Sequence, residues 1–305
     1  MKIIGESGRK GLARVFLAEM RPGLMVEFVD ACDPTAGGRD RKWVIVVSSQ
    51  FGCPVGCLMC DAGGDFRGNL TGGEIIGQIE HAFGMNPEQD PKKCRKLKVQ
   101  FARMGEPALN DAVLDVIRWL AEDYPQAMPC LATVAPAGRE RWFESLWEAS
   151  QRFADLQLQF SMNTTDRAVR DRLMPYPKMA WQEMAAWGER FYRPGRRQPS
   201  LNFALSPGVP CQPEAVLGEF DPRRFVIKLT PLNPTAAAGE NHLECLEGRE
   251  RARELVEQKA AEFAALGYEV IQSVGNMEEN EIGSNCGQMV RRRLAVRPEY
   301  EKTPA

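Results

Sequence analysis

Three cysteines in one short loop constrain this chain more than any other feature. Cys53, Cys57 and Cys60 have the spacing C-x3-C-x2-C and follow the apolar run at residues 43–47. Thiolates that converge from one loop are suited to a metal centre. A structural zinc ion needs a fourth protein ligand, and no Cys or His follows at the spacing of a zinc site. An iron–sulfur cube held by three cysteines leaves one iron open to a small molecule, so the pattern favours a 4Fe-4S cluster over zinc or structural thiols.

The composition of the chain limits the classes of protein to which it can belong. The chain has 305 residues, 44% of them hydrophobic and 26% charged, which suits one large α/β domain, or a domain with a small extension. No stretch approaches the roughly 18 apolar residues of a membrane span, and the N-terminus lacks the apolar core of a signal peptide. Nine cysteines, three of them in one loop, predict reduced thiols and metal ligands rather than disulfides. We therefore expect a cytoplasmic protein without a membrane partner.

The charge of the chain gives little support to the class of strongly basic nucleic-acid-binding proteins. The net charge is -2, and local basic runs occur at residues 92–98, 193–197 and 291–293. Each run is interpreted as a solvated surface segment, with an RNA contact left open. The only histidines are His81 and His242, so a Ser-His-Asp triad or a histidine-rich zinc site is poorly supported.

The pattern of apolar residues predicts strands that alternate with helices. A hairpin is expected at residues 12–18 and 24–29, around a Pro-Gly turn. Further strands are expected at residues 43–47, 97–101, 130–134, 156–161, 201–205, 225–229 and 268–272, and helices at 75–83, 112–121, 139–150, 165–192 and 247–266. Such alternation implies parallel βα units, and about six units form a partial (β/α)6 barrel whose site lies at the C-terminal ends of its strands. The expected regions are an N-terminal β-hairpin extension (1–40), the barrel (41–275) and a C-terminal loop and tail (276–305).

Two further motifs accompany the cysteine loop. One is MGEP at residues 104–107, after the strand at 97–101, and the other is IGSNCGQM at residues 282–289. Together with VSSQFGC at residues 47–53, they resemble the RlmN/Cfr family of radical SAM RNA methyltransferases. The resemblance runs collinearly from about residue 11 to residue 290, and the combination is specific although each motif alone is weak.

The resemblance implies a set of cofactors and roles. Cys53, Cys57 and Cys60 match the ligands of a 4Fe-4S cluster, with S-adenosyl-L-methionine (SAM) as second cofactor and a flavodoxin- or ferredoxin-like reductant as partner. Cys286 matches the cysteine that is methylated and then carries a methylene group to an sp2 carbon of the substrate, and Glu27 matches a glutamate proposed as base. A nucleophilic thiolate suits the first step and a carboxylate suits the removal of a proton. The positions that match SAM contacts are Met59, Gly105, Glu106, Ser161, Asn163 and Asn233.

Structural alternatives stand beside these roles. Glu106 is alternatively a helix cap or a solvent-facing residue, because exposure is the usual fate of glutamate. Cys286 is alternatively a buried core thiol. Glu27 is alternatively a solvent-facing position of a hairpin strand.

The chain also departs from the family. It starts close to its first hairpin, so we expect the family's N-terminal RNA-associated domain to be absent. Val46 stands where the family has the cysteine that resolves the adduct, which leaves Cys32 or an external thiol as candidates, and Ala132 and Asn163 replace a serine and a histidine. Three hypotheses follow: methylation of RNA, radical SAM chemistry on a small molecule or peptide, and a non-catalytic iron–sulfur or zinc module.

Overall fold

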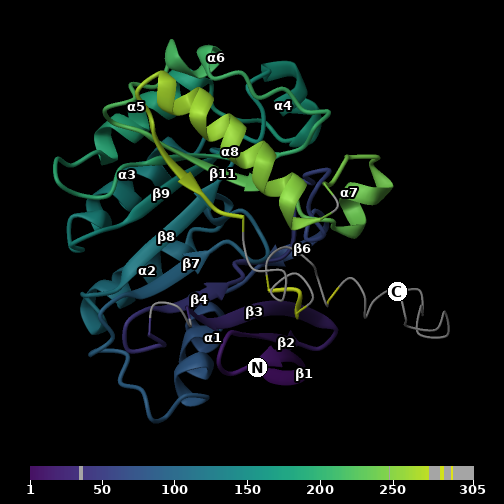
Figure 1. Cartoon of the computed structure of the whole chain (residues 1–305). Coiled ribbons are helices and arrows are strands. Elements are labelled where there is room, and N and C mark those ends of the chain that lie inside the picture. The colour runs from purple at the N-terminus through teal and green to yellow at the C-terminus, as the bar shows by residue number, and fades with distance from the viewer. Residues whose placement is uncertain (34–36, 247, 275–281, 285–289, 291–305) are drawn as a thin grey trace.

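A ten-stranded sheet organises the protein. The computed structural model describes residues 1–33, 37–246, 248–274, 282–284 and 290. The strand order is β1-β2-β3-β4-β7-β8-β9-β10-β11-β12 (Figure 1). Neighbouring strands pair in antiparallel fashion from β1 to β4 and in parallel from β4 to β12. The expected α/β fold, a partial barrel with an antiparallel N-terminal extension, is confirmed.

The strands and helices of the barrel lie close to their predicted positions. The parallel strands are β4 (Trp43–Val47), β7 (Leu97–Phe101), β8 (Met128–Thr133), β9 (Gln157–Ser161), β10 (Ser200–Leu205), β11 (Val226–Pro231) and β12 (Glu269–Gln272). The helices that connect them are α1 (Gly72–Gly84), α2 (Ala112–Asp123), α3 (Glu140–Ser150), α4 (Arg167–Leu173), α5 (Trp181–Phe191), α6 (Glu214–Leu217), α7 (Ala236–Glu240) and α8 (Arg249–Ala265). Among the described helices, none combines the length and apolar character that crossing a membrane requires.

Local sequence signals explain where two of these helices begin and end. Thr71 and Glu74 form a capping box at the start of α1, in which the Glu74 N–H donates to Thr71 Oγ1 (3.2 Å) and the Thr71 N–H donates to Glu74 Oε2 (2.8 Å). Helix α8 is followed by Gly267 with a φ of +89°. This left-handed conformation is the one that glycine adopts most readily after a helix.

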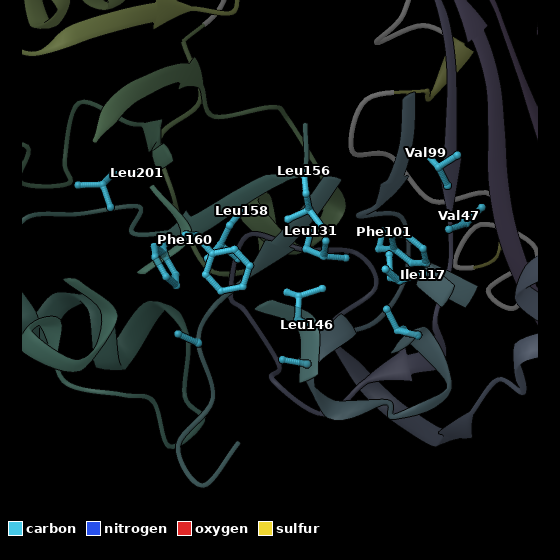
Figure 2. Packing of buried hydrophobic residues seen from close by; sticks show 14 of the residues in the cluster. Val47, Val99, Phe101, Ile117, Leu131, Leu146, Leu156, Leu158, Phe160 and Leu201 are labelled. Atoms are coloured by element: carbon cyan, nitrogen blue, oxygen red, sulfur yellow. The ribbon is translucent and has the colours of Figure 1, made fainter. Parts of the chain in front are cut away.

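Alternation along the strands separates the core from the barrel lumen. Leu97, Val99 and Phe101 of β7 are buried, whereas Lys98 and Gln100 between them point to the other face. Figure 2 shows Val99 and Phe101 side by side with residues of the neighbouring strands and of the covering helices. The labelled strand residues include Leu131, Leu158, Phe160 and Leu201, and Ile117 of α2 and Leu146 of α3 pack beside them. The lumen face is therefore the more polar one.

The N-terminal extension holds one strand more than predicted. Strand β1 (Lys2–Arg9) pairs with β2 (Ala13–Arg21), which pairs with β3 (Leu24–Cys32), and β3 pairs in turn with β4. The predicted hairpin thus continues into the large sheet, with β1 on one side and β4 on the other. Because β1 is a polar edge strand, it carries little of the apolar alternation that marks the others. The domain boundary at residue 40 stays a prediction.

A second small sheet carries the first cysteine. Strand β5 (Gln50–Cys53) and strand β6 (Gly64–Asn69) form an antiparallel hairpin where the sequence predicted only a loop. Gly52 has a φ of +72°, and a Cβ at this position would lie 2.3 Å from the carbonyl oxygen of Asp65. The close approach of the two strands therefore requires glycine at residue 52.

Candidate active site

The cysteine loop lies at the C-terminal end of β4, as predicted. Cys53 ends β5 and is buried, whereas Cys57 and Cys60 are half-buried in the turn that follows. The Cys60 N–H donates to the Cys57 carbonyl (3.0 Å), and the Gly63 N–H donates to the Cys60 carbonyl (2.9 Å). Burial raises the pKa of Cys53 to about 12 and that of Cys57 well above its usual value, and the neighbouring thiols add to both shifts. Cys53 and Cys57 belong to one small apolar cluster, and Cys57 and Cys60 line the same cavity.

The chemistry of this donor set suits an iron–sulfur cube. Within the part of the chain that the structure describes, no three Cys, His, Asp or Glu side chains converge on a single metal ion. A cube does not need such convergence, because each cysteine binds a different iron. A Cβ at Gly63 would lie 3.0 Å from the carbonyl oxygens of Cys57 and Cys60, so the backbone wraps closely behind the thiols. Cys53, Cys57 and Cys60 could therefore hold the cluster together.

The segment after β11 supports the cysteine loop. Thr235 Oγ1 donates to the carbonyl of Met59 (2.8 Å), and Asn241 Nδ2 donates to the carbonyl of Leu58 (3.0 Å). Asn233 precedes this contact, and its carbonyl accepts the Thr235 N–H (2.8 Å). The predicted SAM contact at Asn233 thus belongs to a segment that touches the cysteine loop directly.

Glu106 is a buried carboxylate at the C-terminal end of β7. It is 4% exposed, its Oε1 accepts the Ala108 N–H (3.0 Å) and its Oε2 accepts the Val134 N–H (2.8 Å). Burial raises the pKa of Glu106 to about 7, and no described Lys or Arg forms an ion pair with it. Glu106 does cap the short 3-10 helix Pro107–Leu109, but it does not face solvent. A buried carboxylate without a cation fits an incoming ammonium group.

Gly105 lets the end of β7 pass against the cysteine hairpin. Its φ is +101°, and a Cβ at this position would lie 2.7 Å from both Gln50 Cβ and Ser49 Oγ. The same contact allows Gln50 Oε1 to accept the Glu106 N–H (2.8 Å). Glycine at residue 105 therefore sets the position of the Glu106 carboxylate.

Three further positions predicted to contact SAM lie around the cysteine loop and Glu106. Ser161 ends β9, and Asn163 follows in the left-handed region with a φ of +61°. Asn163 Nδ2 donates to Met174 Sδ (3.3 Å), and its Oδ1 accepts the Ala204 N–H (3.3 Å). Met59 packs against the small apolar cluster that contains Met174. The structure thus brings Met59 and Asn163 to one small apolar cluster of side chains beside the cysteine loop.

Arg170 is a functional candidate that the sequence did not reveal. It is 3% exposed, and its Nη2 donates to the carbonyls of Val134 (3.0 Å) and Ser161 (3.1 Å). Burial lowers the pKa of Arg170 to about 10, while Cys57 is one of the groups that oppose this shift. Arg170 therefore places a buried cation beside the cysteine loop and joins the ends of β8 and β9. Its position one turn before the buried Leu173 in α4 was the available signal.

Glu27 is buried rather than solvent-facing. Its Oε2 pairs with Arg103 Nη2 (2.5 Å), and its Oε1 accepts the Val290 N–H (2.6 Å). Arg103 also donates to the carbonyls of Gly283 (2.7 Å) and Ser284 (3.2 Å). The buried Glu27–Arg103 pair therefore holds residues of the C-terminal segment against β3 and the end of β7.

The structure describes the position of Cys32 but not that of Cys286, the predicted methyl carrier. Cys286 lies outside the described residues, between Ser284 and Val290 in the sequence. Cys32, the candidate resolving thiol, is a buried residue at the end of β3, opposite Trp43 at the start of β4. Ile282 of the C-terminal segment packs in one apolar cluster with Ala31, the neighbour of Cys32. Because Cys286 lies outside the described residues, the role of Cys32 as a resolving thiol stays a prediction.

A cavity of about 410 Å³ opens beside the cysteine loop. This volume lies in the range of small-molecule sites. Its walls come from the β2–β3 turn, the β5–β6 hairpin and α7, and the lining includes Met25, Phe51, Cys57, Cys60, Met104 and Val290. The cysteine loop and the C-terminal segment thus meet at one cavity.

The comparisons with known proteins agree with this arrangement. No protein-family model matches the chain. A probable RNA methyltransferase of Thiobacillus denitrificans is 32% identical over 267 residues, which cover 85% of this chain and 67% of the relative. A probable dual-specificity RNA methyltransferase RlmN of Desulfitobacterium hafniense is 28% identical over 284 residues, or 91% of this chain and 75% of the relative. A radical SAM methyltransferase from Sphaerobacter thermophilus superimposes with a TM-score of 0.73 at 21% identity, over 94% of this chain and 80% of that one. The expected resemblance is confirmed, and the chain belongs to the RlmN-like family of radical SAM methyltransferases.

Proposed function

We propose that this protein methylates an sp2 carbon of an RNA base, with Cys286 as the methyl carrier. The observation that carries the proposal is that the three cysteines follow β4 and the buried, cation-free carboxylate of Glu106 follows β7, at the C-terminal ends of two neighbouring parallel strands. The RNA substrate is supported by the similar chains, which are named as RNA methyltransferases.

Different residues of the site would bind the 4Fe-4S cluster and SAM. Cys53, Cys57 and Cys60 would hold a 4Fe-4S cluster, and Glu106 would accept a hydrogen bond from the SAM ammonium. The remaining proposed SAM contacts are Met59, Gly105, Ser161, Asn163 and Asn233. When bound, the cluster and SAM supply a 5′-deoxyadenosyl radical, with the electron coming from a flavodoxin- or ferredoxin-like reductant. Arg170 would offset part of the negative charge of the thiolates.

Cys286 and Glu27 would act on the substrate side. The Cys286 thiolate would take the SAM methyl group, and the cofactor would leave as S-adenosylhomocysteine. Glu27 would take the proton from the substrate carbon after the carbon–carbon bond forms. Each Glu27 oxygen accepts a hydrogen bond from the protein, and the two lone pairs of a carboxylate oxygen allow it to receive this proton as well. Since Val46 has no thiol, release of the adduct would use Cys32 or an external thiol, or proceed without a disulfide.

Anaerobic reconstitution tests the metal centre. Wild type should bind about four irons and four sulfides and form 5′-deoxyadenosine from SAM after reduction. Cys53→Ala, Cys57→Ala and Cys60→Ala should each lose the visible absorption of the cluster and that product. Cys211→Ala is the matched control, because Cys211 is buried in the main apolar core and should keep both. About one zinc per chain without iron would contradict the proposal.

Labelled SAM tests the substrate. Incubation of the reconstituted protein with cell fractions should place the methyl label in material that ribonuclease digests. Cys286→Ala should abolish this incorporation while 5′-deoxyadenosine formation measured without substrate continues. The net charge of -2 favours the alternative of a small-molecule or peptide substrate, which label in a ribonuclease-resistant fraction would establish.

A further inference from the structure

A second, larger cavity lies at the opposite end of the parallel strands from the cysteine loop. It measures about 840 Å³, and its lining residues precede or begin the strands β4, β7, β8, β9 and β10. The N-terminal ends of parallel strands lie together, one barrel length away from the catalytic ends. The cavity shares no lining residue with the one beside the cysteines. It is therefore a separate feature of the molecule.

The lining of this cavity is strongly basic. Its cationic side chains are Arg41, Lys42, Arg95, Lys96 and Arg197. Asp155 is the single acidic residue in this lining, and its Oδ1 accepts the backbone N–H of Arg197 (3.1 Å). Lys42 pairs with Asp33 (2.8 Å). In this lining one carboxylate therefore stands against five cations, and Asp33 outside it pairs with Lys42.

Most of these cations lack a counter-charge. Among the described residues, no carboxylate forms an ion pair with Arg41, Arg95, Lys96 or Arg197, and Arg197 Nε is buried without a hydrogen-bond partner. Burial lowers the pKa of Lys96, and the charges of Arg197, Lys98 and Lys42 lower it further. Lys96, Arg197 and Lys42, which line the same cavity, are therefore close enough to repel one another, and an anion between them would relieve that repulsion.

We propose that this basic cavity binds a phosphate group, held by Arg95, Lys96 and Arg197. A guanidinium group donates two parallel hydrogen bonds to phosphate oxygens, and an ammonium group adds a point charge. The volume accommodates a ligand the size of a nucleotide. The phosphate comes either from an RNA backbone or from a free phosphorylated molecule, since both present the same oxygens. The proposal does not rest on the methyl-transfer reaction, because the two cavities are separate.

Calorimetric titration with inorganic pyrophosphate in a buffer free of other phosphate tests the site. The reconstituted wild-type protein should show saturable binding. The double variant Lys96→Gln/Arg197→Gln should bind at least about tenfold more weakly, because it loses charge-assisted hydrogen bonds. Arg251→Gln/Arg253→Gln removes two exposed cations from α8 and changes the net charge equally. This control should bind pyrophosphate within about twofold of wild type, since the cations at the site rather than the net charge govern the affinity.

Thermal melting separates loss of the site from loss of the fold. Without phosphate, Lys96→Gln/Arg197→Gln should melt no lower than wild type, because the substitution removes repulsion. Pyrophosphate should raise the melting temperature of wild type and of the α8 control but not of the double variant. Absence of saturable binding to wild type, or equal binding to the double variant, would overturn the proposal.

Competition with a 12-nucleotide single-stranded RNA distinguishes the sources of the phosphate. RNA that displaces pyrophosphate from wild type assigns the site to the RNA backbone. In that case the salt dependence of RNA binding should fall in the double variant, by about 0.7 in slope for each RNA phosphate that the variant no longer binds. Pyrophosphate that stays bound in the presence of RNA assigns the site to a free phosphorylated molecule. Both outcomes retain the phosphate site, and neither depends on whether methyl transfer occurs.

Discussion

At the scale of single residues, the Glu27–Arg103 pair shows how much one buried contact controls. Both side chains are almost fully buried, and the pair reaches residues of the C-terminal segment. Arg103→Met leaves the Glu27 carboxylate buried without its cation, and we expect the free energy of unfolding to fall by about 3–5 kcal/mol. Urea denaturation followed by circular dichroism measures the change.

The double variant Arg103→Met/Glu27→Gln gives the matched comparison. It removes both charges, so it should recover a substantial part of the stability that Arg103→Met loses. Equal stability of the two variants would show that the Arg103 hydrogen bonds to Gly283 and Ser284, rather than the buried charge of Glu27, account for the loss.

Asp30 predicts how stability depends on pH. Burial alone would raise the pKa of Asp30, but hydrogen bonds from Arg39, Asn86 and Arg14 outweigh it and lower the pKa below its usual value. The ionised carboxylate therefore stabilises the fold above the unfolded pKa of about 4, and this contribution is lost as the pH falls through the folded pKa. Wild type should exceed Asp30→Asn by about 3–5 kcal/mol at pH 7. That difference should shrink as urea denaturation is repeated at pH values from 5 towards 3, and a constant difference would contradict the assignment.

At the scale of elements, glycines decide whether neighbouring segments can approach. Gly105→Ala would force a Cβ into Ser49 and Gln50 at a φ of +101°. We expect a loss of at least about 1–2 kcal/mol from backbone strain alone, together with weaker SAM binding, because Glu106 shifts with residue 105. Gly77→Ala in α1 is the control, since its Cβ meets nothing within 4 Å, and it should gain about 0.5–1 kcal/mol. Thermal melting and equilibrium dialysis with SAM measure both effects.

The elements that the sequence predicted well are those whose own pattern defines them. Strands β4 and β7 have the predicted bounds, because a buried parallel strand is a continuous or alternating apolar run. Strands β1, β5 and β6 were missed, since an edge strand and a short hairpin are stabilised by their partners more than by their own apolar residues. The local periodicity of apolar residues does not indicate how elements that are distant in the sequence pack together.

The site could be predicted only where residue type and spacing carry the chemistry. The cysteine loop and Glu106 lie where the motifs placed them. Arg103 and Arg170 were missed because each acts through tertiary contacts, to Glu27 in one case and to the ends of β8 and β9 in the other. An arginine in a charged stretch is most often exposed, so only the fold reveals a buried one.

At the scale of the whole molecule, β1 closes one edge of the large sheet. It pairs with β2 from Lys2 to Arg9, and Ser7 Oγ also donates to the carbonyl of Ile282 (3.3 Å). Removal of residues 2–9 would leave the backbone of β2 unpaired along an apolar strand, and such edges promote association. We expect more light scattering from the shortened chain than from wild type at equal concentration. Ser7→Ala, which removes only the side-chain hydrogen bond, should scatter like wild type.

The contact between Glu27 and Val290 joins positions 263 residues apart in the sequence. During synthesis at ~5–20 residues per second, the Glu27 carboxylate therefore waits on the order of tens of seconds for that partner. Cys53, Cys57 and Cys60 are all translated within this interval. The nascent chain thus displays its thiols well before its own C-terminal segment reaches the cavity beside them, so iron delivery can begin while the chain is still being synthesised.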